Sequence, residues 1–269
     1  RNVFEANNIG VKNVALALHG TITSAISDEW PASSAPSRLL AELRVREHLQ
    51  YRAADVRYAL SEYYAEYWLR YSKRKCRPLD PLLLVGNVQP VEARGKEKPD
   101  VVFIGRRERR KGPDIFVDIG WSLSPKSYKD ITFIGADSSG HNGISSSSIL
   151  PTMTALRNLY FKSYEHLNRE ELDELFQSRT VVVLPSRYDQ FNLIALEALR
   201  FGCPVFVSQN TGAAVWIKKN YPELSDLIID IDCSRSGADA VRTALEDYDK
   251  LRQRIVSAIK KGPRKKGNL

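Results

Sequence analysis

The stretch VVVLPSRYDQFNLIALEALRFGCPVFV, residues 181–207, decides the fold. It begins and ends with short valine-rich runs, residues 181–184 and 205–207, of the kind that form strands buried on both faces of a sheet. Between them, apolar residues recur at helical spacing from residue 192 to residue 201, and Gly202 follows as a natural end of a helix. A strand, a helix and a strand in succession predict two parallel strands joined by a crossover helix.

The same alternation extends outward on both sides of this stretch. Apolar runs predict strands at residues 101–104, 131–134 and 227–231, and helical periods predict helices at residues 113–123, 170–177 and 238–260. Residues 100–269 are therefore expected to form a complete, Rossmann-like, doubly wound α/β domain. Ligands of such domains bind at the carboxyl ends of the strands.

Residues 1–86 show a shorter alternation of the same kind. Strands are predicted at residues 14–18, 55–60 and 82–85, with a helical period around residues 39–49 and a second helix that starts with Ser61 as its N-cap. This pattern predicts a partial Rossmann-like domain, because it has too few strands for a complete sheet. The mainly polar residues 87–99, which contain two prolines, are expected to link the two domains.

The composition excludes several classes of protein. The chain has 269 residues, of which 43% are hydrophobic, and its longest apolar runs fall far short of the ~20 residues that a membrane helix needs. Three widely spaced cysteines suggest neither a disulfide framework nor a zinc site, and they favour a reducing, cytoplasmic compartment. The start at Arg1 and the single methionine, Met153, are interpreted as signs of a piece of a longer protein.

The charge predicts an anionic partner. The net charge is +8, from 40 Lys and Arg against 32 Asp and Glu, which suits a nucleotide, a nucleic acid or an acidic membrane surface. Nucleic acid is disfavoured, because no known binding motif is present and the basic residues are spread along the chain. The basic tail, residues 260–266, could contact anionic lipid head groups on the inner face of a membrane.

The first segment that carries chemistry is VVFIGRRERRKG, residues 101–112. A predicted strand runs into Gly105 and a basic loop, and Pro113 then stands at the first position of the next helix, where proline is favoured. Helix N-termini attract anions, so Arg106 and Lys111 beside one predict a clamp for a phosphate or diphosphate. A solvated basic turn is the alternative, and it is the preferred interpretation for Arg107, Arg109 and Arg110. The loop is not a P-loop, because that motif's glycines and hydroxyl are missing.

The second segment is the loop and helix of residues 185–201. The loop carries Arg187 and Asp189, and free N–H groups near Asn192 and Leu193 could hold phosphate oxygens. Glu197 lies five residues further along, about 7.5 Å along a helix axis, which is about the distance from a diphosphate to its ribose. An unpaired charge inside the apolar run LIALEAL would be costly, so Glu197 is interpreted as a ribose ligand rather than a surface acid.

These residues resemble a known family. GRRERRKG and LPSRYDQFNLIALEALRFGCPV resemble the donor-binding, C-terminal domain of the retaining GT-B glycosyltransferases of family 4, the glycosyl transferases group 1. In that family a Gly-Arg…Lys loop grips the nucleotide diphosphate, and a pair of acids eight residues apart follows a Pro-Ser loop, as Asp189 and Glu197 do here. ITFIGAD and LNREELDELFQSRTVVVLPS resemble neighbouring parts of that domain, and LALHG and VREHLQYRAADVRYALSEYYAEYW resemble the end of the family's N-terminal domain.

The resemblance implies a role for each matching residue. Arg106 and Lys111 would neutralise the diphosphate and stabilise the departing nucleotide. Asp189 would bind hydroxyls of the donor sugar, Glu197 would hold the ribose, and the N–H groups of Asn192 and Leu193 would face sugar and phosphate. The implied catalytic residues are His19, Arg106, Lys111 and Asp189, and the implied donor-binding residues are Gly105, Arg106, Lys111, Asp189, Asn192, Leu193 and Glu197. No cofactor or metal ion is implied.

The chain also departs from the family pattern. Asp189 stands where the family usually has Glu, Asn192 replaces a usual Gly, and residues 1–86 are about half of the family's N-terminal domain. The expected function is transfer, with retention, of a sugar from a nucleotide diphosphate sugar, UDP first and GDP second, to a hydroxyl of a glycan, lipid or other acceptor, as in polysaccharide biosynthesis. The alternatives are a non-catalytic donor-binding subunit of a split glycosyltransferase, a basic nucleic-acid-binding module, and a dehydrogenase-type domain, which lacks support because no GxGxxG motif follows a predicted strand.

Overall fold

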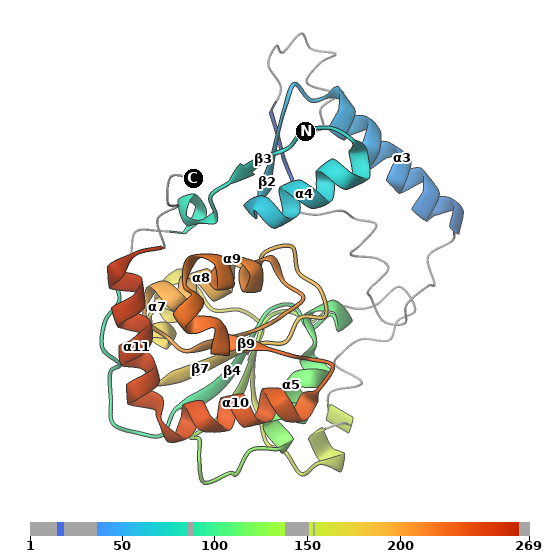
Figure 1. The fold of residues 1–269 in the computed structure, drawn as a ribbon. Coiled ribbons are helices and arrows are strands. Elements are labelled where there is room, and N and C mark those ends of the chain that lie inside the picture. The colour runs from blue at the N-terminus through green and yellow to red at the C-terminus, as the bar shows by residue number, and fades with distance from the viewer. Residues whose placement is uncertain (1–14, 19–36, 86–88, 138–150, 153, 264–269) are drawn as a thin grey trace. The chain divides into compact units, whose positions relative to one another are not determined.

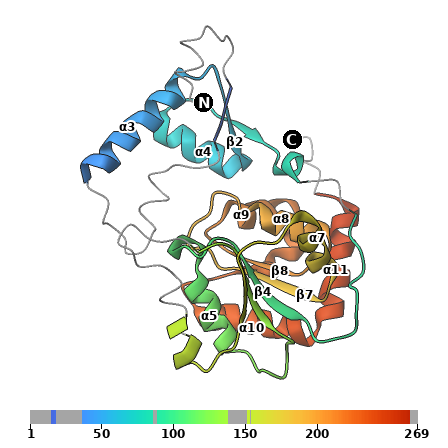
Figure 2. The same ribbon diagram turned by 180° about the vertical axis from the view of Figure 1, so that it is seen from behind.

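The computed structural model describes residues 15–18, 37–85, 89–137, 151–152 and 154–263. It divides into two compact units, Arg1–Leu84 and Val85–Leu269, which are drawn from two sides in Figures 1 and 2. Each unit is built on parallel strands, and each is described by itself below.

The first unit contains, in its described residues, a three-stranded parallel sheet with the order β1-β2-β3. Its core is aromatic: Tyr51 stacks on Trp68 with ring centroids 4.7 Å apart, and Tyr64 packs edge-on against Trp68 at 6.1 Å. The elements are β1 (Ala15–Leu18), α3 (Ser37–Ala53), β2 (Val56–Leu60), α4 (Ser61–Ser72), β3 (Arg77–Leu79) and the 3-10 helix η1 (Pro81–Leu84). The predicted alternation of strand and helix is confirmed.

Two local predictions for this unit are wrong. The run at residues 82–85 is not a strand, because residues 81–84 form η1 and β3 lies earlier in the chain, at Arg77–Leu79. Ser61 is not an N-cap: Leu60 takes that position, and Ser61 is the first helical residue, with φ +74°. The strand β2 ends at Leu60 and leaves no connecting residue before α4, so the turn falls on Ser61 itself.

The second unit contains, in its described part, a six-stranded, all-parallel sheet with the order β6-β5-β4-β7-β8-β9. Helices α5 and α10 cover one face, and α7, α8 and α9 cover the other (Figures 1 and 2). The strands are β4 (Asp100–Ile104), β5 (Ile131–Ile134), β6 (Lys162–Tyr164), β7 (Thr180–Leu184), β8 (Val205–Ser208) and β9 (Ile228–Ile229). The helices are η2 (Arg109–Lys111), α5 (Pro113–Trp121), α7 (Arg169–Gln177), α8 (Leu193–Arg200), α9 (Gly212–Asn220), η3 (Pro222–Leu227), α10 (Ser234–Glu246) and α11 (Tyr248–Lys261).

The strand order reverses between β4 and β7. The chain proceeds from β4 outward to β5 and β6, then returns to β7 on the other side of β4, where Val102 pairs with Val182. In doubly wound folds this reversal opens a crevice at the carboxyl ends of the two strands. The loops that the sequence analysis singled out follow these two strands.

Three features of this unit differ from the sequence-based expectation. Residues 238–260 do not form one helix, because the chain breaks at Asp247 (φ −112°, ψ 35°) between α10 and α11. The last strand is only two residues long, since η3 occupies the residues before it. Strand β6 and helix α9 had no counterpart in the prediction. Residues 89–99 pack onto this unit, with Val91 N–H donating to the Phe201 carbonyl and Arg94 N–H donating to the Gln177 carbonyl.

Candidate functional site

The loops that follow β4, β5 and β7 come into close contact at the crevice. Gly105 N–H donates to the Ile134 carbonyl at 2.8 Å, and a Cβ on Gly135 would overlap the Gly105 carbonyl. Gly112 has φ +71°, and a Cβ there would overlap the carbonyl oxygen of Pro185. The predicted basic loop therefore lies directly against the loop that carries Asp189.

Arg187 joins the two loops. Its backbone N–H donates to the Arg110 carbonyl at 2.8 Å, and its guanidinium donates to the Arg109 carbonyl at 2.8 Å. The same guanidinium forms a two-pronged ion pair with Asp114, at 2.8 and 2.5 Å. Bidentate pairs of this kind fix geometry as well as charge, so Arg187 holds the basic loop and the start of α5 in place.

Lys111 and Asp189 meet across the two loops. The Lys111 Nζ contacts Asp189 Oδ2, although the two residues are 78 positions apart, and both side chains are mostly buried. Arg110 approaches the other oxygen, with its Nη1 3.9 Å from Asp189 Oδ1, and its side chain is only 18% exposed. The expectation of a solvated Arg110 is therefore wrong, and the Asp189 carboxylate lies between two cations.

Glu108 organises the arginines of the loop, and the sequence analysis did not single it out. It is almost fully buried, forms an ion pair with Arg106 at 2.8 Å, and accepts a hydrogen bond from Arg110 at 3.1 Å. Arg106, by contrast, has a side chain that is 66% exposed. Arg106 therefore connects to Asp189 through Glu108 and Arg110. The signal that could have found Glu108 is a single acid within the basic run GRRERRKG, two residues from an arginine on each side.

Helix α8 begins next to this cluster. Its N-cap, Asn192, is in the left-handed conformation with φ 63° and ψ 77°, which asparagine tolerates better than most residues. Its side chain does not cap the helix, so no side chain at the N-cap takes up the N–H groups of the first turn. Such N–H groups can donate hydrogen bonds to a bound anion. Asn192 and Leu193 therefore lie where the prediction placed them, at the amino end of a helix that follows Asp189.

Glu197 has a partner that the sequence analysis did not predict. Its Oε2 accepts from Arg169 Nη1 at 2.8 Å, and its side chain is 16% exposed. Arg169 is the first residue of α7. The burial of Glu197 is thus explained by an ion pair between two helices, and it does not by itself demand a ligand. The other carboxylate oxygen, Oε1, has no protein partner in the part of the chain that the structure describes.

The predicted residues therefore fall into three groups. Lys111 and Asp189 touch each other, and Arg106 reaches them through Glu108 and Arg110. Asn192, Leu193 and Glu197 belong to the helix that follows. His19 lies outside the described residues. The ion pairs described above join four cations to three acids. The cations are Arg106, Arg110, Lys111 and Arg187, and the acids are Glu108, Asp114 and Asp189.

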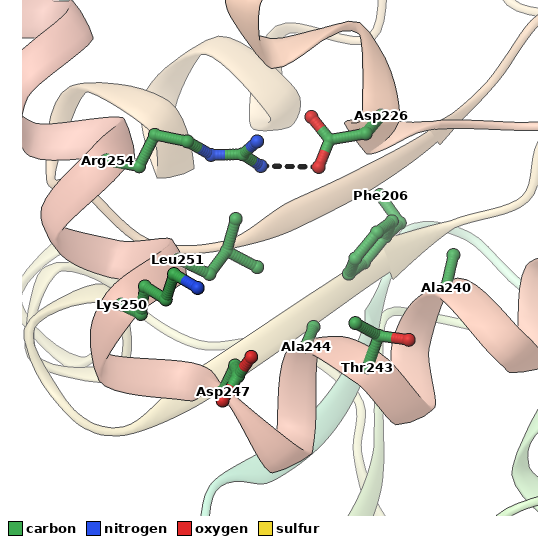
Figure 3. A pocket seen from close by; sticks show the side chains of 9 residues that line it. All are labelled: Phe206, Asp226, Ala240, Thr243, Ala244, Asp247, Lys250, Leu251 and Arg254. Atoms are coloured by element: carbon green, nitrogen blue, oxygen red, sulfur yellow. Dashed lines mark hydrogen bonds and ion pairs between the residues drawn. The ribbon is translucent and has the colours of Figure 1, made fainter.

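Elsewhere in the second unit, described residues line two cavities. One, of about 370 Å³, lies between α10, α11, η3 and β8, and Figure 3 shows the Arg254–Asp226 ion pair at its edge. The other, of about 550 Å³, lies near the amino ends of β5 and β6. None of the predicted site residues lines either cavity. Within the described residues no cluster of three or more metal-binding side chains occurs, and no helix is long and apolar enough to cross a membrane.

Solved structures similar to this chain define the class of the fold. Sucrose-phosphate synthase from Thermosynechococcus elongatus has a TM-score of 0.70 with 20% identity, over 96% of this chain and 65% of that one. Anabaena HepE, solved in complex with UDP and glucose, has a TM-score of 0.68 with 18% identity, over 94% of this chain and 67% of that one. The chain has a GT-B type, Rossmann-like α/β fold, which confirms the predicted fold class.

The family follows from the sequence match. The model of the family "Glycosyl transferases group 1" matches residues 87–262, and the chain belongs to this family, as the resemblance implied. A curated relative, the D-inositol 3-phosphate glycosyltransferase of Corynebacterium urealyticum, is 29% identical over 161 residues, which are 58% of this chain and 36% of that protein. The chain spans about a third of the length of the curated relatives it matches.

Proposed function

We propose that this chain carries the donor site of a retaining glycosyltransferase that takes a sugar from a nucleotide diphosphate sugar. The observation that carries the proposal is the contact of Lys111 with Asp189 at the carboxyl ends of β4 and β7, beside the amino end of α8. A cation, an acid and a first helical turn without a side-chain cap at one point are suited to a ligand that joins a diphosphate to a hydroxyl-rich sugar.

The geometry supports a division of labour between these groups. Lys111, Arg106 and the first turn of α8 would bind the diphosphate, and Asp189 would accept from hydroxyls of the donor sugar. In the transfer, the bond between the anomeric carbon and the β-phosphate oxygen breaks, and a bond to the acceptor oxygen forms on the same face of the sugar. The acceptor's proton leaves with the nucleoside diphosphate. Cations fixed where the leaving group gains charge stabilise that transition state, so we propose that no metal ion is needed.

UDP is the nucleotide that we propose first, with GDP second. One similar structure, that of Anabaena HepE, was solved with UDP and glucose. The acceptor that we propose is a hydroxyl of a glycan, a lipid or another molecule. The cytoplasmic location and the contact of residues 260–266 with a membrane stay predictions.

Isothermal titration calorimetry with UDP, GDP and ADP tests the proposal. We expect UDP or GDP to bind with a Kd between micromolar and millimolar, and Lys111→Ala and Glu197→Ala each to weaken binding at least tenfold, about 1.4 kcal/mol. Lys129→Ala is the matched control, because Lys129 pairs with Glu97 near the amino end of β5 and its loss changes the net charge equally. Failure of all three nucleotides to bind, or equal effects of Lys111→Ala and Lys129→Ala, would contradict the proposal.

A further inference from the structure

The ion pair between Arg169 and Glu197 uses one oxygen of the carboxylate and leaves the other open. Arg169 Nη1 lies 2.8 Å from Glu197 Oε2, whereas Oε1 has no protein partner among the described residues. The Glu197 side chain is mostly buried, and Arg169 is 51% exposed. A carboxylate held by one oxygen in this way presents its second oxygen in a single orientation.

Arg169 is itself held in place. It begins α7, whose N-cap Asn168 forms a capping box: Glu171 N–H donates to Asn168 Oδ1 at 3.0 Å, and Asn168 N–H donates to Glu171 Oε2 at 2.7 Å. The second nitrogen of the guanidinium, Nη2, lies 2.8 Å from Asp173 on the next turn. The fork of the arginine therefore bridges its own helix and α8, and the capping box fixes the end of α7 from which it extends.

We propose that Arg169 is a positioning residue that orients Glu197 toward the pentose of the nucleotide and so makes the site select ribonucleotides over 2′-deoxyribonucleotides. The inference rests on the proposed function, because it takes Glu197 as the group that binds the pentose. Ribose offers two neighbouring hydroxyl donors, at O2′ and O3′, and deoxyribose lacks the first. A pinned Oε1 cannot turn to recover the lost hydrogen bond, and a site built to bind a hydroxyl rejects the analogue that lacks it.

Without Arg169, Glu197 would be free to rotate. Both of its oxygens could then reach the remaining O3′ hydroxyl, so the penalty for deoxyribose should fall. The affinity for the ribonucleotide should fall as well. The ion pair now fixes the orientation of the Glu197 carboxylate, and without it the bound nucleotide would have to fix that orientation at a cost in binding free energy. Both effects lower the ratio of the affinity for the ribonucleotide to the affinity for the deoxyribonucleotide. Damage to the fold would instead weaken both nucleotides to the same extent.

Calorimetry with UDP and 2′-deoxy-UDP on the full chain tests the proposal, or GDP and 2′-deoxy-GDP if GDP binds more tightly. We expect the wild type to prefer the ribonucleotide at least tenfold and Arg169→Met to reduce this preference to threefold or less. Arg169→Lys, which keeps the charge but not the fork, should retain part of the preference. Glu197→Gln should lower the preference as well, and adding Arg169→Met to Glu197→Gln should change the ratio no further.

The matched control is Arg254→Met, which also breaks an ion pair between two elements, the pair with Asp226 in Figure 3. It should leave the ratio within twofold of wild type. The proposal is overturned if Arg169→Met weakens both nucleotides equally, or if the wild type binds both equally well. If UDP binds and Glu197→Gln has no effect, the role of Glu197 is wrong while donor binding stands. If neither UDP nor GDP binds the wild type, the proposed function itself fails, and this inference with it.

Discussion

Replacing Arg252 with methionine should lower the free energy of unfolding of the second unit by about 2–4 kcal/mol. Arg252 lies on α11, is 3% exposed, and no carboxylate pairs with it in the described part of the chain. Its guanidinium donates instead to neutral oxygens. The acceptors, at distances of 3.0 to 3.3 Å for the nearest nitrogen, are the carbonyls of Phe176, Ser178, Phe201 and Val91 and the hydroxyl of Tyr248.

The magnitude follows from what the carbonyls at the ends of α7 and α8 would keep. The Ser178 carbonyl keeps the Tyr248 hydroxyl at 3.2 Å, and the Phe201 carbonyl keeps the Val91 N–H at 3.4 Å. The Phe176 carbonyl, in the last turn of α7, accepts from the Arg252 side chain. The carbonyls on either side of it have other donors: that of Leu175 accepts from the hydroxyls of Ser178 and Thr180, and that of Gln177 accepts from the Arg94 N–H. Leaving that carbonyl unpaired costs about 1–3 kcal/mol.

Two further contributions set the expected range. The cation also lies at the carboxyl ends of α7 and α8, where a positive charge contributes about 0.3–1 kcal/mol for each helix. Methionine returns part of the loss, because it buries apolar surface without the cost of burying a charge. The net loss is therefore expected in the middle of the range that these contributions span, at about 2–4 kcal/mol.

Urea unfolding combined with hydrogen exchange measures this loss. Because the chain has two compact units, one urea transition need not report on the second unit alone, so exchange in peptides covering β7 and α11 is needed to assign the change to that unit. Arg254→Met, two residues from Arg252 on the same helix, removes an exposed ion pair and should cost less than about 1 kcal/mol. A loss below 1 kcal/mol for Arg252→Met, or equal losses for the two variants, would refute the accounting of carbonyls given above.

Two other perturbations have defined outcomes. Gly112→Ala should cost more than about 2 kcal/mol and impair nucleotide binding, because the new Cβ would overlap the Pro185 carbonyl, whereas Gly262→Ala, also at positive φ but with nothing within 4 Å, should cost only about 1 kcal/mol. Calorimetric melting of both variants checks this, and similar losses would mean that the contact with Pro185 is absent. Burial raises the pKa of Cys203 from 9.0 and that of Tyr248 from 10.0, in each case to about 12. Between these pKa values both groups keep their protons in the folded state, whereas the unfolded chain loses them. Their contribution to the free energy of unfolding is therefore complete below about pH 9 and is lost as the pH rises toward 12, at about 1.4 kcal/mol per pH unit for each group. Cys203→Ala should flatten the fall in the free energy of unfolding between pH 9 and 10, and an unchanged slope would show that the thiol is not buried as described.

The sequence predicts those elements whose own residues carry the signal. Strand β7 and helix α8 have continuous apolar patterns and were expected at nearly their observed bounds. Strand β6 has the sequence KSY, with every residue exposed, and it exists because β5 offers a neighbouring edge on which to pair. The break between α10 and α11 contains no proline or glycine, so the helical spacing of apolar residues predicts one continuous helix there.

The same distinction holds for the site. Lys111, Asp189 and Glu197 could be selected because each stands at a definite place in a motif. Their ionic partners could not, since Arg169 is 28 residues from Glu197 and Lys111 is 78 residues from Asp189, and only the fold decides which charges meet. A charge within LIALEAL does need a partner. The structure provides that partner in Arg169, so the burial of Glu197 does not require a nucleotide.

Two arginines tie α7 to α8, and their exposure separates what they contribute. Arg252 is buried and binds carbonyls near the carboxyl ends of both helices, so its loss leaves the Phe176 carbonyl without its donor and acts on stability. Arg169 is half-exposed, and solvent can replace much of its ion pair with Glu197, so the pair adds little to stability. What solvent cannot replace is the direction in which Glu197 Oε1 is held. The contribution of Arg169 should therefore be sought in the ratio of two nucleotide affinities, where a loss of stability common to both nucleotides cancels.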